Sequence, residues 1–306
     1  STHYYVTNDG YRYSQDLRGL DPNGYVLYAN SFGFLDNGQP LYKDLRTMGT
    51  GTQTQFALID PTLLSPGVTT QIAQYPIFFS DVSNNAEVEK VLAALNIPLT
   101  PPSPTVSNLS FSGHLVGSTT TVGAGGTFTF TTTNTITYQI VVSRNGADFD
   151  PMNVNNAVLT GIAGTGTHNV NWDGKDNSGV NFPAGGPYTF RVLGRNGEVH
   201  FPIIDAENNP GAGPTITRLN GTNFGDRTVY YDDRGYRTSS GNLVGNLNGT
   251  LCPTASPAAP TVPASLLGVD SSTNYRNWGS GSNANSDCAS GAGWGDAKGL
   301  NLWTYF

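Results

Sequence analysis

Charged residues are scarce in this chain. They make up 12% of its 306 residues, about half the share of a typical soluble domain. The net charge is −7 and no basic block offsets it, so we expect no nucleic-acid partner. No stretch approaches 18 uninterrupted apolar residues, so the sequence predicts no membrane span.

Signatures of the common catalytic sites are missing too. The sequence has no GxSxG elbow, no HExxH pair and no glycine-rich phosphate loop. Its four histidines are scattered: His3, His114, His168 and His200. We therefore expect no enzyme, no catalytic residues and no required cofactor. A hydrolase stays open as an alternative only if separated acids share a cleft, namely Asp9, Asp205, Asp232, Asp233 and Asp296.

The abundant residues favour short strands and turns. The chain has 38 Gly and 19 Pro, with 37% hydrophobic and 11% aromatic residues, a composition that builds cores and turns rather than disorder. The sequence predicts an all-β, multi-domain protein with one short helix near residues 85–96. Asn84 is its expected cap, and Val88, Val91, Leu92 and Leu95 are expected on one face.

Three segments are predicted. A first β-rich module with the helix covers residues 1–100, and a proline-rich linker follows at 99–104. A β-sandwich covers 105–205, with strands near 127–131, 136–142, 167–172, 188–193 and 199–204. A loop-rich β module covers 206–306. The chain starts at Ser1 rather than Met, which we interpret as a mature secreted chain after signal removal.

The most specific pattern lies in the middle segment. A strand ends in Trp172, the turn Asp173-Gly174-Lys-Asp176-Asn-Ser-Gly179 follows, and Pro183-Ala-Gly-Gly-Pro-Tyr188 leads into the next strand. The pattern resembles the signature of FlgD-type immunoglobulin-like domains, which occur in flagellar hook-capping proteins and as modules of secreted bacterial surface proteins. The resemblance covers residues 136–197, with an expected insertion near 147–159. It implies an Ig-like sandwich that scaffolds and connects.

Composition and resemblance together favour a secreted, non-enzymatic structural protein of the bacterial surface or extracellular space. It would be a filament or surface-layer subunit that associates with itself or with other surface proteins through strand edges or termini. The candidate assembly residues are Tyr4, Tyr5, Trp303, Tyr305 and Phe306. The alternative is a carbohydrate-binding or adhesin module, or an accessory region of an extracellular hydrolase, with exposed aromatics stacking on glycans.

Metal candidates are few. Asp173, Asp176, Asp232 and Asp233 could contribute oxygen ligands to Ca²⁺. Lys175 lies among the would-be ligands of the first pair, and the spacing is not that of a calcium loop. We therefore favour aspartates that cap backbone N–H groups of the turn.

Covalent features are predicted at a few positions. Cys252 and Cys288 are expected to form a disulfide in an exported protein. Asn108, Asn220 and Asn248 start glycosylation sequons. An isopeptide cross-link of the kind found in surface adhesins needs a lysine beside Asn or Asp and a buried acid. With only four lysines, one in the helix and one in the turn, the sequence argues against it.

Overall fold

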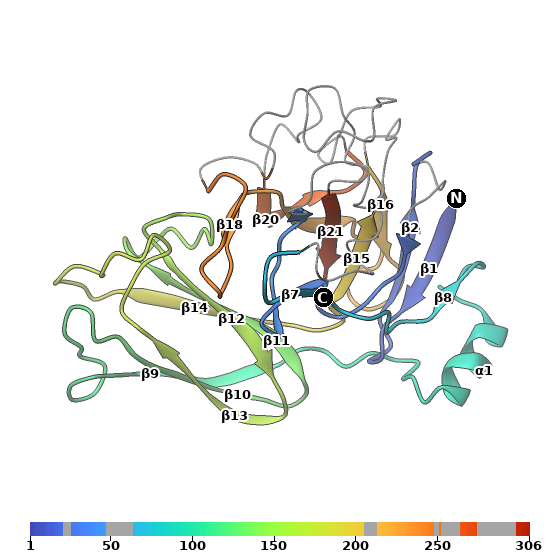
Figure 1. Cartoon of the computed structure of the whole chain (residues 1–306). Coiled ribbons are helices and arrows are strands. Elements are labelled where there is room, and N and C mark those ends of the chain that lie inside the picture. The colour runs from blue at the N-terminus through green and yellow to red at the C-terminus, as the bar shows by residue number, and fades with distance from the viewer. Residues whose placement is uncertain (21–25, 47–63, 205–212, 248–250, 252–263, 274–297) are drawn as a thin grey trace. The chain divides into compact units, whose positions relative to one another are not determined.

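The computed structural model describes residues 1–20, 26–46, 64–204, 213–247, 251, 264–273 and 298–306. It confirms the all-β prediction, with a single helix among these residues (Figure 1). The chain divides into two compact units. Unit 1 comprises residues 1–101 and 197–305, and unit 2 comprises residues 102–196 with Phe306.

Unit 2 is built from two antiparallel sheets of three strands each, in the orders β13-β10-β9 and β12-β11-β14. The strands are β9 (Val106–Gly113), β10 (Gly126–Thr132), β11 (Ile136–Ser143), β12 (Ala157–Ala163), β13 (Gly166–Trp172) and β14 (Thr189–Arg195). Alternation in β10 turns Phe128 and Phe130 inward, and they share a core with Ile136 and Ile140 of β11. The two sheets, green and yellow in Figure 1, thus enclose one apolar core, as in a β-sandwich.

Unit 1 contains the remaining strands. Its first segment supplies β1 (Thr2–Val6), β2 (Arg12–Asp16), β3 (Val26–Leu27), β4 (Phe34–Asp36), β5 (Gln39–Pro40), β6 (Leu45–Arg46), β7 (Val68–Thr70) and β8 (Ile77–Phe78). Its second segment supplies β15 (Val199–Ile204), β16 (Thr215–Arg218), β17 (Thr228–Asp232), β18 (Tyr236–Arg237), β19 (Leu243–Val244), β20 (Ala264–Asp270) and β21 (Lys298–Thr304).

The two segments of unit 1 share sheets. One sheet has the order β16-β2-β1-β8, and another has the order β20-β17-β21-β15-β3 with β6 also paired to β21. The described residues of 1–100 and 206–305 therefore belong to one unit, whereas the sequence predicted two flanking modules. β15 pairs with β21 and β3 in this unit, so it is not the sandwich strand that its alternation predicted. Strand pairing over such distances leaves no local sequence signal.

The proline-rich segment does mark a boundary, since the units divide between Pro101 and Pro102. The single helix, α1, runs from Ala86 to Ala94. Its cap is Asn85 rather than the expected Asn84, because the Asn85 side chain accepts from the N–H groups of Glu87 and Val88. Only Val88 and Leu92 of the expected face are buried; Val91 and Leu95 are exposed.

Candidate functional site

The residues of the predicted signature form one turn at an end of the sandwich, here called the signature turn (residues 172–180). Trp172 is the last residue of β13 and lies in the core of unit 2, as expected. Its indole N–H donates to the Lys175 carbonyl at 2.9 Å. Its ring packs edge-on against Phe182, with the ring centres 4.9 Å apart. Trp172 therefore joins the turn to the apolar interior.

The two aspartates of the signature turn accept hydrogen bonds from its backbone. Asp173 accepts from the Lys175 N–H at 3.0 Å, and Asp176 accepts from the N–H groups of Ser178 and Val180, each at 2.9 Å. Arg144 of unit 2 also binds the Asp176 carboxylate at 2.5 Å. Burial alone would raise the pKa of Asp176, but the hydrogen bonds from Ser178 and Val180 and the Arg144 charge lower it. Both side chains fix the turn, as the sequence favoured.

Gly174 belongs to the signature because of a close approach. Its φ is +78°, and a Cβ there would lie 2.8 Å from the backbone nitrogen of Gly125. A larger residue would displace the segment that precedes β10. The glycine thus brings the signature turn against the loop at 118–125.

The Asn177 side chain binds the backbone of the segment near 147–159, which the sequence predicted to be an insertion. Its amide donates to the carbonyls of Pro151 and Asn153, at 3.1 and 2.9 Å, and its oxygen accepts from the Val158 N–H. The expected insertion at 147–159 is only partly a loop, since β12 begins at Ala157 and pairs with β11. The sequence of β12 does not alternate between apolar and polar residues, so it carried no clear strand signal.

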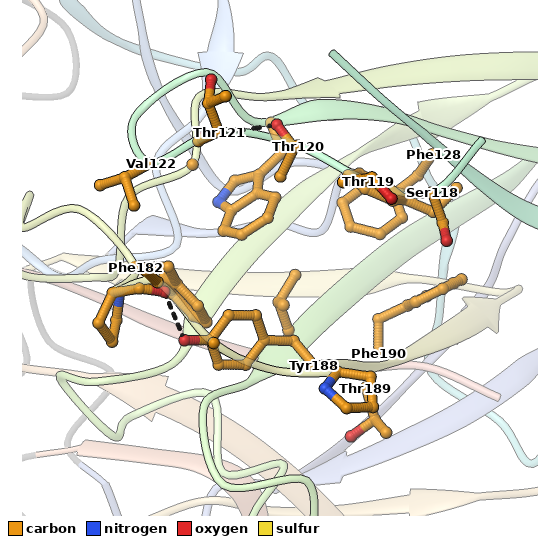
Figure 2. Close-up of a pocket in the computed structure, with 18 of the residues that line it drawn as sticks. Ser118, Thr119, Thr120, Thr121, Val122, Phe128, Phe182, Tyr188, Thr189 and Phe190 are labelled. Carbon is orange, nitrogen blue, oxygen red and sulfur yellow. Dashed lines mark hydrogen bonds between the residues drawn. The ribbon is translucent and has the colours of Figure 1, made fainter. Parts of the chain in front are cut away.

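A cavity of about 730 Å³ opens at this end of unit 2 (Figure 2). The 118–122 segment lies on one side of it, and Phe182, Tyr188 and Phe190 lie on the other. Trp172, Phe111, Phe128 and Val142 also line it. The rim carries exposed apolar side chains, since Leu109 and Val122 are 50% and 54% exposed.

The chemistry of this cavity is neutral. No Asp, Glu, Lys, Arg or His is among the residues that line it. Two of its hydroxyl groups donate within unit 2: Tyr188 to the Pro183 carbonyl at 2.7 Å, and Thr120 to the Gly125 carbonyl at 2.5 Å. Such a site can hold an uncharged, largely apolar group and exclude water from it. It offers no acid–base pair.

Two edge strands flank the cavity. Leu109 and Phe111 come from β9, and Thr189 and Phe190 come from β14. Each of these strands is the last in its three-stranded sheet, with a hydrogen-bonded strand on one side among the described residues. An apolar cavity therefore lies beside two strand edges that can accept a further strand.

The other two metal candidates, Asp232 and Asp233, lie in unit 1, and Asp232 belongs to a charged cluster defined as Lys43, Asp232 and Arg234. The Lys43 Nζ lies 2.6 Å from Asp232 Oδ2, and Arg234 Nη2 lies 2.7 Å from the same oxygen. Asp233 is fully buried beside them. Among the residues that the structure describes, no group of three His, Cys, Asp or Glu side chains is placed to hold a metal. Asp232 instead has two cationic partners.

A second set of polar contacts in unit 1 centres on His200, one of the four histidines that are scattered in the sequence. His200 is fully buried, its Nε2 lies 2.8 Å from Glu198 Oε1 and its Nδ1 lies 2.9 Å from Asn301 Oδ1. The Tyr42 hydroxyl donates to the same Glu198 oxygen at 2.6 Å. Trp303 stacks on the imidazole at 5.6 Å between ring centres. These contacts bind the two segments of unit 1.

The acids of the hydrolase alternative have separate partners where the structure describes them. Asp9 accepts from the Gly197 N–H at 3.0 Å, whereas Asp232 binds Lys43 and Arg234. Asp205 and Asp296 lie outside the described residues.

The candidate assembly residues are largely engaged inside the fold. β1, with Tyr4 and Tyr5, pairs with both β2 and β8, and Tyr5 is fully buried. Trp303 on β21 is buried between paired strands, and Tyr305 stacks on Tyr230. Phe306 exchanges backbone hydrogen bonds with Asn196. Both terminal strands thus have partners within the chain, and assembly through them stays a prediction.

The covalent candidates have mixed outcomes. Asn108 is exposed on β9, whereas the Asn220 amide donates to the Gly10 carbonyl and accepts from the Arg12 N–H, each at 2.9 Å. A glycan on Asn220 would have to break these contacts, so we no longer expect one there. Asn248, Cys252 and Cys288 lie outside the described residues.

No described helix is both long enough and apolar enough to cross a membrane. Comparisons with known proteins give no match: no family model, no curated protein and no solved structure matches this chain. The resemblance to FlgD-type domains remains a prediction from the signature residues.

Proposed function

We propose that this chain is a non-enzymatic bacterial surface or extracellular structural protein whose sandwich unit binds an extended apolar segment of a partner protein. The observation that carries the proposal is the uncharged, aromatic-lined cavity between the edge strands β9 and β14. A partner strand can hydrogen-bond to an exposed edge while its alternate side chains enter the cavity. The edges of unit 2 are favoured over the terminal strands, because both terminal strands are paired within the chain.

Three features support an apolar segment as the occupant. The cavity wall supplies six aromatic side chains: Phe111, Phe128, Trp172, Phe182, Tyr188 and Phe190. The rim residues Leu109 and Val122 extend the apolar surface outward. The absence of charged lining residues removes any selection for an ionic ligand.

A neutral glycan is the second candidate. Ser110, Ser118, Thr119, Thr121 and Thr189 place hydroxyl groups around the same aromatic wall. Sugars need such donors and acceptors together with aromatic faces. We rank the neutral glycan second because two of the aromatic rings, those of Trp172 and Phe128, are enclosed in the core at 7% and 2% exposure.

The test is calorimetric titration of the full chain with a blocked peptide in which valine and threonine alternate. We expect saturable binding of the peptide and none of a panel of neutral oligosaccharides. Binding of an oligosaccharide instead of the peptide would support the glycan candidate and overturn the apolar-segment proposal. Binding of neither would overturn both.

A matched pair of variants locates the site. Leu109→Asp places a charge on the rim and should weaken peptide binding by about tenfold or more, from lost apolar contact. Leu193→Asp makes the same change on β14 at a residue that does not line the cavity and is 41% exposed. The peptide affinity of Leu193→Asp should match that of the unmodified protein. An equal loss of peptide affinity in both variants would show that the peptide binds elsewhere.

A further inference from the structure

We propose that Lys43 and Asp232 are joined in the mature protein by an isopeptide bond between Lys43 Nζ and Asp232 Cγ. The two residues come from the separate segments of unit 1, 189 positions apart. The inference concerns a different unit from the cavity and is independent of the proposed function.

The first support is proximity in a buried setting. The Lys43 Nζ lies 2.6 Å from Asp232 Oδ2, and the two side chains are 18% and 3% exposed. The backbones are also tied together, because the Asp44 N–H donates to the Asp232 carbonyl at 2.9 Å. Because the fold already holds the two reacting groups together, the reaction does not have to pay the entropy cost of bringing them into contact.

The second support is the set of donors around the Asp232 carboxylate. Its Oδ1 accepts from the backbone N–H and the Nε of Arg234, each at 3.0 Å. Its Oδ2 accepts from Lys43 Nζ at 2.6 Å and from Arg234 Nη2 at 2.7 Å. Two N–H donors on one oxygen are the arrangement that stabilises the oxyanion of a tetrahedral intermediate. Oδ1 is thus placed to become the amide oxygen, and Lys43 and Arg234 both donate to Oδ2, the oxygen that leaves.

The third support is the state of the amine. Burial lowers the pKa of Lys43, and the Arg234 charge lowers it further, while Asp232 and Asp44 act in the opposite direction. A lower pKa makes the uncharged, nucleophilic amine more accessible.

The step balances without an oxidant or a cofactor. One ammonium proton passes from Lys43 to Oδ2, which leaves a neutral amine and a carboxylic acid. The Nζ lone pair then attacks Cγ, and the oxyanion forms on Oδ1. A second proton passes from Nζ to the Oδ2 hydroxyl, the Cγ–Oδ2 bond breaks, and water leaves. The products are one neutral amide and one water molecule.

The test is the intact mass of the purified full chain after reduction of its cysteines. We expect a mass below that of the sequence by one water molecule. Tryptic mapping should give a branched peptide that joins the segments around residues 43 and 232. Both Lys43→Ala and Asp232→Ala should restore the full sequence mass.

The chain contains its own control pair. Lys90 Nζ lies 2.7 Å from Glu87 Oε1, but both side chains are exposed. These residues should appear in ordinary, unbranched peptides of the same digest. A full-length mass equal to that of the sequence, with Lys43 and Asp232 in separate peptides, would show an ordinary ion pair and overturn the proposal. This result needs no variant, so misfolding of a variant cannot obscure it.

Discussion

The two units differ in what their interiors hold. In unit 2 Asp173, Asp176 and Asn177 lie at a turn and bind backbone groups, and the core cluster is apolar. In unit 1 the interior holds ionisable side chains, including Asp44, Asp233 and His200, each fully buried.

This difference indicates that the two units have different roles. An apolar interior that opens at one end is suited to binding a neutral group by shape. A buried set of acids, amines and imidazole is costly unless each member has a partner, so it holds one arrangement of the chain. We therefore attribute ligand binding to unit 2 and the fastening of two distant segments to unit 1.

The largest expected effect comes from the core of unit 2. Phe130→Ala removes a fully buried ring from between the two sheets. It should lower the free energy of unfolding of unit 2 by about 3–5 kcal/mol, as measured by denaturation with hydrogen exchange of unit 2 amides. Leu115→Ala, at a residue 51% exposed, should change it by less than about 0.5 kcal/mol. Equal effects would contradict the placement of the core.

The matching test in unit 1 removes one charge from its interior. Glu198→Gln weakens the acceptor of His200 and Tyr42, and should cost about 1.5–3 kcal/mol in the unfolding free energy of unit 1. The same substitution at Glu87, in the exposed pair with Lys90, should cost no more than about 0.5 kcal/mol. If both variants lose the same unfolding free energy, the buried contacts of Glu198 stabilise unit 1 no more than a surface ion pair does.

The positions of four strands of unit 2 could be predicted from sequence, and the sheets of unit 1 could not. β10, β11, β13 and β14 are apolar or alternating runs bounded by turn residues, which are local signals. β15 has a similar local pattern, but its partner β21 is about a hundred residues away in the chain, and no local pattern specifies that pairing.

The candidate site was predictable only in part. Trp172 and Tyr188 stand out in the signature, whereas Leu109, Val122 and Phe182 reach the cavity from segments without a motif. Lys43 gave no signal at all, because its partner Asp232 is brought to it by tertiary contacts alone.

A smaller effect on stability is expected from removing the charge of Asp176 in unit 2. Because the folded-state pKa of Asp176 is lowered, its contribution is present above the unfolded-state pKa of about 3.9 and is lost as pH falls through the folded value. Asp176→Asn should cost unit 2 about 1–2 kcal/mol at neutral pH and reduce its loss of stability in acid. Denaturation curves recorded between neutral and acidic pH measure both effects. An unchanged acid profile would contradict the assigned role of Asp176.

The smallest effect is expected at the helix of unit 1. Asn85→Ala removes the cap of α1 and should cost about 1 kcal/mol, whereas Asn84→Ala should have almost no effect. Thermal unfolding of the two variants side by side distinguishes the residues. A larger loss in Asn84→Ala would show that the helix begins one residue earlier.

The most direct test of the account is the heat-capacity change when the alternating valine–threonine peptide binds the full chain. Calorimetric titrations over a range of temperatures measure it. Burial of apolar surface in the cavity of unit 2 predicts a clearly negative value that Leu109→Asp reduces and Leu193→Asp does not. A value near zero, or one unaffected by Leu109→Asp, would contradict binding through this cavity.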